Sequence, residues 1–98
     1  MDLHLAEPAD AHAISTLSKS EIEQGLSQSW VPTRIRKAIA DPETNVLVAK
    51  DDGVLIGFGI MIYREETAHL CLFAVEPRFR RRGVGTALLA WLERVAQV

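Results

Sequence analysis

The chain has 98 residues, of which 48% are hydrophobic and 24% charged, and its formal net charge at neutral pH is −2. This composition is typical of a folded globular protein and excludes a disordered chain, while the mild acidity argues against the broad basic surface of a nucleic-acid binder. The length predicts one domain over residues 1–98, or part of one.

No segment of the sequence predicts a membrane, disulfide or metal function. The longest apolar run, residues 54–63, is far shorter than the roughly 20 residues that cross a bilayer. A single cysteine, Cys71, forms no intramolecular disulfide, and the N-terminus lacks the basic and apolar regions of a signal peptide. The three histidines show no metal-ligand spacing. We therefore expect a cytoplasmic protein with no metal and no membrane partner.

The first segments of the chain predict a short strand and then a helix. Residues 3–6 alternate apolar and polar side chains, as in a strand at the edge of a sheet. From Pro8, apolar side chains recur at helical spacing, with proline in the first turn, where its missing N–H costs little. We expect this helix to run to about residue 18, and an extension toward residue 25 stays open.

A second helix is predicted after a loop. Residues 25–32 form the expected loop, which contains Trp30. Thr33 is expected to be the N-cap of a helix over residues 34–40, since its hydroxyl suits the unpaired N–H groups of a first turn. Asp41-Pro42 ends this helix because the residue before proline resists helical angles.

The middle of the chain predicts a β-hairpin followed by a third strand. Residues 46–50 and 54–63 are apolar runs joined by Asp51-Asp52-Gly53, and Asp-Gly supplies the positive backbone angles of a tight turn. After a turn at residues 64–66, residues 68–75 are almost wholly apolar. We expect this strand to lie in the middle of the sheet and to be buried on both faces.

A last helix is predicted from about Gly83, with one apolar stripe that packs on the sheet. The stripe comprises Val84, Leu88, Trp91, Leu92 and Val95. The expected order is thus strand, helix, helix, strand, strand, strand, helix. This order predicts an α/β fold with helices on both faces of the sheet.

The turn before the last helix predicts an anion site. Gly83 and Gly85 let the backbone approach a ligand closely, and the N–H groups of a first helical turn have no partner inside the helix. The helix N-terminus adds a partial positive charge. Positive side chains crowd the same turn, namely Arg78, Arg80, Arg81 and Arg82. We therefore predict a phosphate-bearing ligand.

The spacing of the glycines indicates which of the known phosphate-binding motifs the sequence fits. A dinucleotide fingerprint fits poorly, because it needs a third glycine where Leu88 stands and because residues 76–82 separate the strand from the first glycine. A Walker A loop needs a Gly-Lys pair, which the chain lacks. Arg80-x-x-Gly83-x-Gly85 instead resembles the Arg/Gln-x-x-Gly-x-Gly/Ala signature of the GNAT superfamily of acetyl-CoA-dependent N-acetyltransferases. The resemblance extends over nearly the whole chain and implies a mixed, largely antiparallel sheet.

The resemblance implies acetyl-CoA as the cofactor. Its diphosphate would be held by the main chain of residues 81–86, where the backbone amides count for more than the side chains. The matching residues are Arg80, Arg81, Arg82, Gly83, Val84, Gly85 and Thr86. The resemblance also implies that Phe73 and Val75, on either side of Ala74, pair with the pantetheine arm like an added strand. The strand at residues 68–75 would splay from its next neighbour and admit the cofactor.

His69 is the candidate general base. The expected reaction is attack of an amine on the acetyl thioester, which needs a deprotonated ammonium and a stabilised oxyanion. His69 lies four residues before Phe73, where the resemblance implies the glutamate base of the histone-acetylating branch, and histidine can accept a proton near neutral pH. Trp30 is the candidate for the acceptor pocket. A purely structural role stays open for both residues.

The resemblance also implies elements that follow residue 98 in a complete member of the family. These are a further strand, helix and hairpin (β-α-β-β), including a tyrosine general acid, so the chain is expected to hold roughly the N-terminal two thirds of the fold. Tyr63 is expected to be a core or rim residue, and Cys71 a small buried hydrophobe. A chain with an unpaired apolar strand associates readily, so we expect a homodimer or a strand-swapped oligomer if the chain is not a fragment.

The resemblance therefore predicts an N-acetyltransferase that moves an acetyl group from acetyl-CoA to a primary amine of a small molecule, peptide or protein. The alternative is a non-catalytic module that binds coenzyme A or drives oligomerisation. Binding of nucleic acid through the arginines conflicts with the net charge of −2.

Overall fold

Four antiparallel strands form one sheet in the order β1-β2-β3-β4 in the computed structural model, which describes residues 1–21 and 30–96. The strands are β1 (Asp2–Leu5), β2 (Thr44–Asp51), β3 (Val54–Arg64) and β4 (Thr67–Val75). The helices are α1 (Ala11–Glu21), α2 (Pro32–Ala40) and α3 (Val84–Ala96), with short 3₁₀ helices at η1 (Pro8–Asp10) and η2 (Pro77–Phe79). The predicted α/β order of elements is confirmed.

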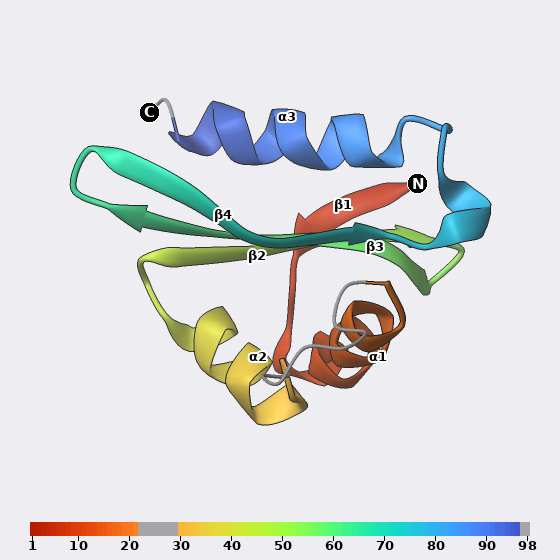
Figure 1. Ribbon diagram of the computed structural model, residues 1–98, viewed down its shortest axis with the longest axis horizontal. Helices are drawn as coiled ribbons and strands as arrows, with labels where there is room; N and C mark the ends of the chain where they lie inside the picture. Colours follow the sequence, from red (N-terminus) through yellow and green to blue (C-terminus); the bar gives the residue numbers. More distant parts are fainter. Residues whose placement is uncertain (22–29, 97–98) are drawn as a thin grey trace.

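The helices cover the two faces of the sheet in separate layers. Figure 1 shows α3 on one face and α1 with α2 on the other. Side chains that alternate along β2 therefore enter two cores: Val46 and Val48 pack with α1 and α2, whereas Leu47 and Ala49 pack with α3. Because both faces are covered, the middle of β2 and β3 is buried throughout.

The predicted hairpin between β2 and β3 is confirmed. Asp51 pairs with Val54, and the two residues between them have positive φ angles of 53° at Asp52 and 80° at Gly53. These angles belong to the tight two-residue turn that Asp-Gly favours, because glycine takes them without steric cost.

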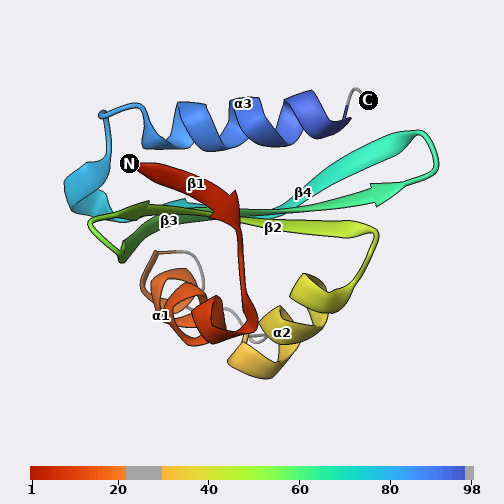
Figure 2. The ribbon, with the colours of Figure 1, turned by 180° about the vertical axis from the view of Figure 1, so that it is seen from behind.

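The position of β4 differs from the prediction. It is the last strand in the order of the described sheet, and its first five residues, 67–71, are exposed. The β3–β4 turn projects past the ends of α2 and α3, as both views show (Figure 1, Figure 2), so the residues of β4 next to this turn lie beyond the described helices. Cys71 is accordingly exposed and is not the buried hydrophobe that its apolar neighbours predict.

The helix boundaries also differ in detail. The N-cap of α2 is Val31, with Pro32 in the first turn, so Thr33 is not the cap; its hydroxyl accepts a hydrogen bond from Arg36 instead. Val95, on the predicted apolar stripe of α3, is exposed. Most of the loop expected at residues 25–32 lies outside the described residues. No helix in the described part of the chain is both long and apolar enough to cross a membrane.

Candidate functional site

The site lies where β4 passes into α3. After Val75 the chain makes the short helix η2, whose N-cap carboxylate, on Glu76, accepts a hydrogen bond from Arg78 N at 3.2 Å. The turn that follows contains two residues with positive φ, Arg81 at 64° and Gly83 at 82°. Such an angle is uncommon outside glycine, and strained backbone of this kind is concentrated at functional sites.

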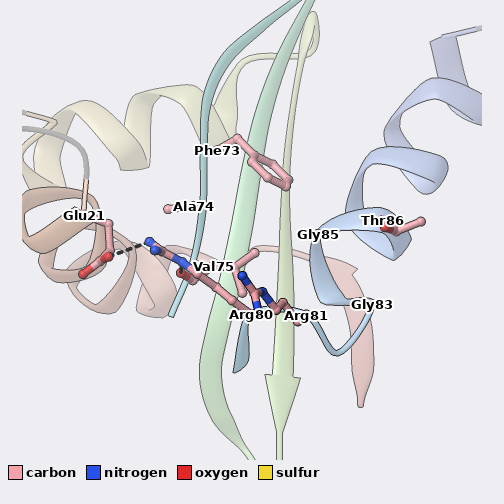
Figure 3. Close-up of a pocket in the computed structure, with 9 residues that line it drawn as sticks. All are labelled: Glu21, Phe73, Ala74, Val75, Arg80, Arg81, Gly83, Gly85 and Thr86. Atoms are coloured by element: carbon pink, nitrogen blue, oxygen red, sulfur yellow. Dashed lines mark hydrogen bonds and ion pairs between the residues drawn. The ribbon is translucent and has the colours of Figure 1, made fainter. Parts of the chain in front are cut away.

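A cavity of about 380 Å³ opens between this turn, the end of β4 and the last turn of α1. Figure 3 shows the residues that line it. They are Glu21, Phe73, Ala74, Val75, Arg80, Arg81, Gly83, Gly85 and Thr86. Eight of these nine belong to the predicted cofactor site, so the fold brings most of that set together.

Backbone donors of α3 line one side of the cavity. The N–H of Ala87 donates to the carbonyl of Gly83 at 3.0 Å, which marks Gly83 as the residue that starts the helical hydrogen bonding. The N–H groups of Val84, Gly85 and Thr86 then precede any intrahelical acceptor. Together with the positive end of the helix dipole they can bind an anion.

The two glycines of the turn have different roles. A Cβ at Gly83 would meet no atom within 4 Å, so this glycine is required by its φ angle of 82°. A Cβ at Gly85 would lie 3.2 Å from Cζ of Phe73 and 3.6 Å from Cγ2 of Val75. Gly85 therefore lets α3 pack closely on β4.

The four arginines of the turn do not all face the cavity. Arg78 pairs with Glu76 at 3.2 Å, and the guanidinium of Arg82 lies 5.3 Å from the ring centre of Phe79. Only Arg80 and Arg81 line the cavity. With Glu21 on the opposite wall, the lining side chains among the described residues carry two positive charges and one negative charge, a net charge of +1.

Glu21 is the lining residue that sequence reasoning missed. Its Oε1 lies 2.7 Å from Nη2 of Arg80, and its side chain is 18% exposed. The two residues are 59 positions apart, and nothing local to either predicts their contact. Only the packing of α1 beside β4 brings them together.

His69 lies on β4 outside this cavity. It is exposed, and the register pairs it with Ile62, while Leu70 pairs with Met61. Met61 packs under α3, so Leu70 shares that face and His69 lies on the opposite one, because partners across a strand pair share a face. A β-bulge at this point of β4 produces the reversal, since without it His69 would share the face of Phe73.

Trp30 lies on the side of the molecule formed by α1 and α2. It is half-buried, packs against the core of that layer, and has the guanidinium of Arg34 3.9 Å from its ring centre. It does not line the cavity at the turn. The structure thus separates Trp30 from the predicted cofactor residues.

Tyr63 has a packing role in the described fold. Its hydroxyl accepts a hydrogen bond from Asn45 Nδ2 at 3.2 Å and donates to the carbonyl of Leu92 at 3.4 Å. It thereby links β3 to α3. Within residues 1–21 and 30–96, no group of three or more histidine, cysteine, aspartate or glutamate side chains could hold a metal ion.

The family to which the chain is similar is found over a range that contains the site residues. The chain matches the Acetyltransferase (GNAT) family over residues 11–97, which includes α1, the whole of β2 to β4 and the turn into α3. No curated protein sequence matches the chain at a significant level.

Solved structures share the fold. A ribosomal-protein-alanine N-acetyltransferase from Brucella melitensis biovar Abortus 2308 is 25% identical, with a TM-score of 0.78, over 98% of this chain and 71% of that one. A PaiA N-acetyltransferase from Thermoplasma acidophilum in complex with coenzyme A is 16% identical, with a TM-score of 0.81, over 98% and 71%. An aminoglycoside 6'-N-acetyltransferase complexed with coenzyme A is 22% identical, with a TM-score of 0.81, over 99% and 56%. The chain thus spans only part of each neighbour.

Proposed function

Because the chain belongs to the acetyltransferase (GNAT) family, we propose that it binds coenzyme A at the turn between β4 and α3 and acetylates a primary amine. The amine would belong to a small molecule, a peptide or a protein. The observation that carries this proposal is the cavity itself, where the exposed backbone edge of β4 meets the N-terminus of α3. We take residues 1–98 as one acetyltransferase unit, a part of the domain that the neighbours contain.

The residues of the cavity fit the two chemical parts of coenzyme A. The diphosphate suits the N–H groups of residues 81–86 and the guanidinium of Arg81. The amide-containing pantetheine arm suits the backbone groups of Phe73 and Val75, which can pair with it as with an added strand. A cavity of about 380 Å³ has room for the diphosphate and the adjoining part of the arm.

We propose His69 as the group that takes the proton from the attacking ammonium. Acetyl-CoA, when bound, supplies the acetyl group as a thioester. An arm that runs along β4 away from the turn leads toward His69, about 13 Å from Phe73 for four residues of extended chain. Exposure of His69 allows a water molecule to relay the proton. Trp30 is proposed to contact the acceptor, with Arg34 fixing its ring.

One observation favours a second candidate function, binding of coenzyme A without catalysis. His69 is outside the cavity and on the face opposite Phe73, so among the described residues the titratable side chains that line the cavity are those of Glu21, Arg80 and Arg81. A chain of this kind would bind the cofactor and release no thiol.

One experiment separates the two functions. Calorimetric titration with coenzyme A measures binding, and free-thiol release from acetyl-CoA with a panel of primary amines measures turnover. We expect micromolar binding and amine-dependent thiol release. Gly83→Val, which cannot easily take the positive φ of the turn, should abolish both, whereas Gly53→Asn in the β2–β3 turn should abolish neither. No heat with the folded wild type would refute the proposal, and heat without thiol release would leave the binding function.

We also propose that two copies associate through the first half of β4. Residues 67–71 are exposed, Leu70 by 43%, and within the described sheet no strand pairs with the outer edge of β4. Pairing of this edge with its copy would give the backbone groups of residues 67–71 partners and leave the cavity at residues 73–75 open. It would also close the path along β4 to His69, so the paired form would bind coenzyme A without catalysis. Light scattering should show a dimer whose fraction rises with protein concentration, and Leu70→Lys should shift it to monomer. A monomer at millimolar concentration would contradict the proposal.

A further inference from the structure

The carboxylate of Glu21 lies in a cavity that otherwise suits an anion. Glu21 is the last residue of α1, and its Oε1 holds Nη2 of Arg80 at 2.7 Å (Figure 3). Nε of Arg80 donates to the carbonyl of Val75 at 3.3 Å, at the end of β4. The guanidinium of Arg80 is thus held between α1 and β4 by two acceptors.

Because of this ion pair, the two walls of the cavity differ in charge. The charge of Arg80 is cancelled by Glu21, so the wall beside α1 and the edge of β4 is neutral. The opposite wall keeps the guanidinium of Arg81 and the positive end of α3, and none of its lining residues within the described ranges 1–21 and 30–96 is a carboxylate. A negatively charged group is therefore attracted to the α3 side alone.

We propose that Glu21 determines the specificity of the coenzyme A site by neutralising Arg80 and confining phosphate binding to residues 81–86. The inference rests on the proposed function. With Arg80 paired, the α1 side of the cavity accepts an uncharged, hydrogen-bonding chain such as pantetheine and disfavours a second phosphate position. A small free anion gains nothing from Arg80, so coenzyme A is selected over phosphate compounds that lack the neutral arm.

The charge of Glu21 is removed without loss of its shape in Glu21→Gln. We expect the affinity for inorganic pyrophosphate to rise roughly 3- to 10-fold, because a repelling charge is lost and Arg80 becomes available. Affinity for coenzyme A should rise less, so the selectivity for coenzyme A over pyrophosphate falls. In Arg80→Gln the affinity for pyrophosphate should fall by a similar factor, because the carboxylate of Glu21 is left without its partner beside the cavity.

The experiment is calorimetric titration of the wild type, Glu21→Gln, Arg80→Gln and the double variant with pyrophosphate and, separately, with coenzyme A. The double variant should return to wild-type pyrophosphate affinity. Glu66→Gln, an exposed carboxylate on the β3–β4 turn, is the matched control and should change neither affinity. Thermal unfolding of each variant confirms that the chain is folded at the titration temperature.

Two results would overturn the inference: a lower pyrophosphate affinity in Glu21→Gln, or a double variant whose pyrophosphate affinity stays as low as that of Arg80→Gln. The first would make Glu21 a brace for the turn, and the second would place Arg80 on the phosphate. If Glu21→Gln strengthens pyrophosphate binding but coenzyme A does not bind, the proposed function fails and the control of anion binding by Glu21 stands. If coenzyme A binds and pyrophosphate binding ignores Glu21, only this inference fails.

Discussion

Gly57 in the middle of β3 lies directly under Val84, the first residue of α3. A Cβ at Gly57 would lie 3.2 Å from Cγ1 of Val84, and equally close to Cδ1 of Leu88 and the carbonyl oxygen of Ala74. All three neighbours are buried. The missing side chain therefore sets how closely the N-terminus of α3 approaches the sheet, and with it the height of the phosphate turn above β4.

Gly57→Ala should destabilise the fold and weaken the site together. Three close neighbours, one of them backbone, cannot all give way, and overpacking of this kind costs roughly 1–3 kcal/mol of unfolding free energy. Urea denaturation measures the loss, and titration with coenzyme A measures the weaker binding. Val84→Ala removes the crowded Cγ1, so the double variant should lose less than the sum of the single losses. Additive losses would show that Val84 is not the crowded neighbour.

The stability of the fold should depend on pH through Asp10 and Lys50, whose Oδ1 and Nζ are 2.7 Å apart. Burial raises the pKa of Asp10, but hydrogen bonds from Lys50 and from the N–H of Glu7 outweigh it, and the pKa lies below its ordinary value. The carboxylate thus stabilises the folded state fully above the unfolded-state pKa near 4, and this contribution is lost as the pH falls through the folded-state pKa.

Asp10→Asn tests that dependence. At pH 7 it should lower the unfolding free energy by about 1–2 kcal/mol, because a charge-assisted hydrogen bond is lost. The gap between wild type and variant should shrink as the pH falls below about 4. Asp2→Asn, at an exposed position of β1, is the control and should show no such gap. A gap that stays constant from pH 7 to pH 3 would show that the stabilisation does not come from the charge of Asp10.

The sequence predicts the parts of this site that depend on local chemistry. Asp52-Gly53 and the Arg80 to Gly85 turn were both identifiable because their glycines adopt or permit backbone geometry that few other residues accept. The order of elements follows from apolar periodicity in the same local way. The cavity-lining backbone of residues 73–75 is found because it directly precedes that turn.

What the sequence does not predict depends on contacts distant along the chain. The pairing of Glu21 with Arg80 arises from the packing of α1 against the end of β4. The exposure of Cys71 depends on where the helices end. An apolar run predicts a buried strand whether or not a helix covers it. The face of His69 depends on one extra residue in β4, and a bulge leaves no trace in apolar periodicity.

The catalytic proposal rests on His69, and His69→Ala tests it. If His69 accepts the proton of the ammonium, turnover should fall by tenfold or more while the KM for acetyl-CoA stays unchanged, because the residue is outside the cavity. Amine-dependent thiol release at saturating acetyl-CoA gives both constants. His12→Ala, an exposed histidine on α1, is the matched control. A loss of less than tenfold would assign His69 a structural role.

Replacement of Arg81, the strained residue of the turn, by glycine should raise the stability of the fold and weaken the binding of coenzyme A. Arg81 has a φ of 64°, an angle that costs a residue with a Cβ about 1 kcal/mol or more and glycine almost nothing. Arg81→Gly should therefore raise the unfolding free energy by about 1 kcal/mol in urea denaturation. It should also weaken coenzyme A binding roughly tenfold, since a guanidinium that lines the cavity is lost. Arg81→Lys keeps the charge and the strained angle, so it should leave stability unchanged and lose less affinity. A parallel fall of stability and affinity in Arg81→Gly would mean that the Arg81 side chain holds the turn in place and does not serve the anion.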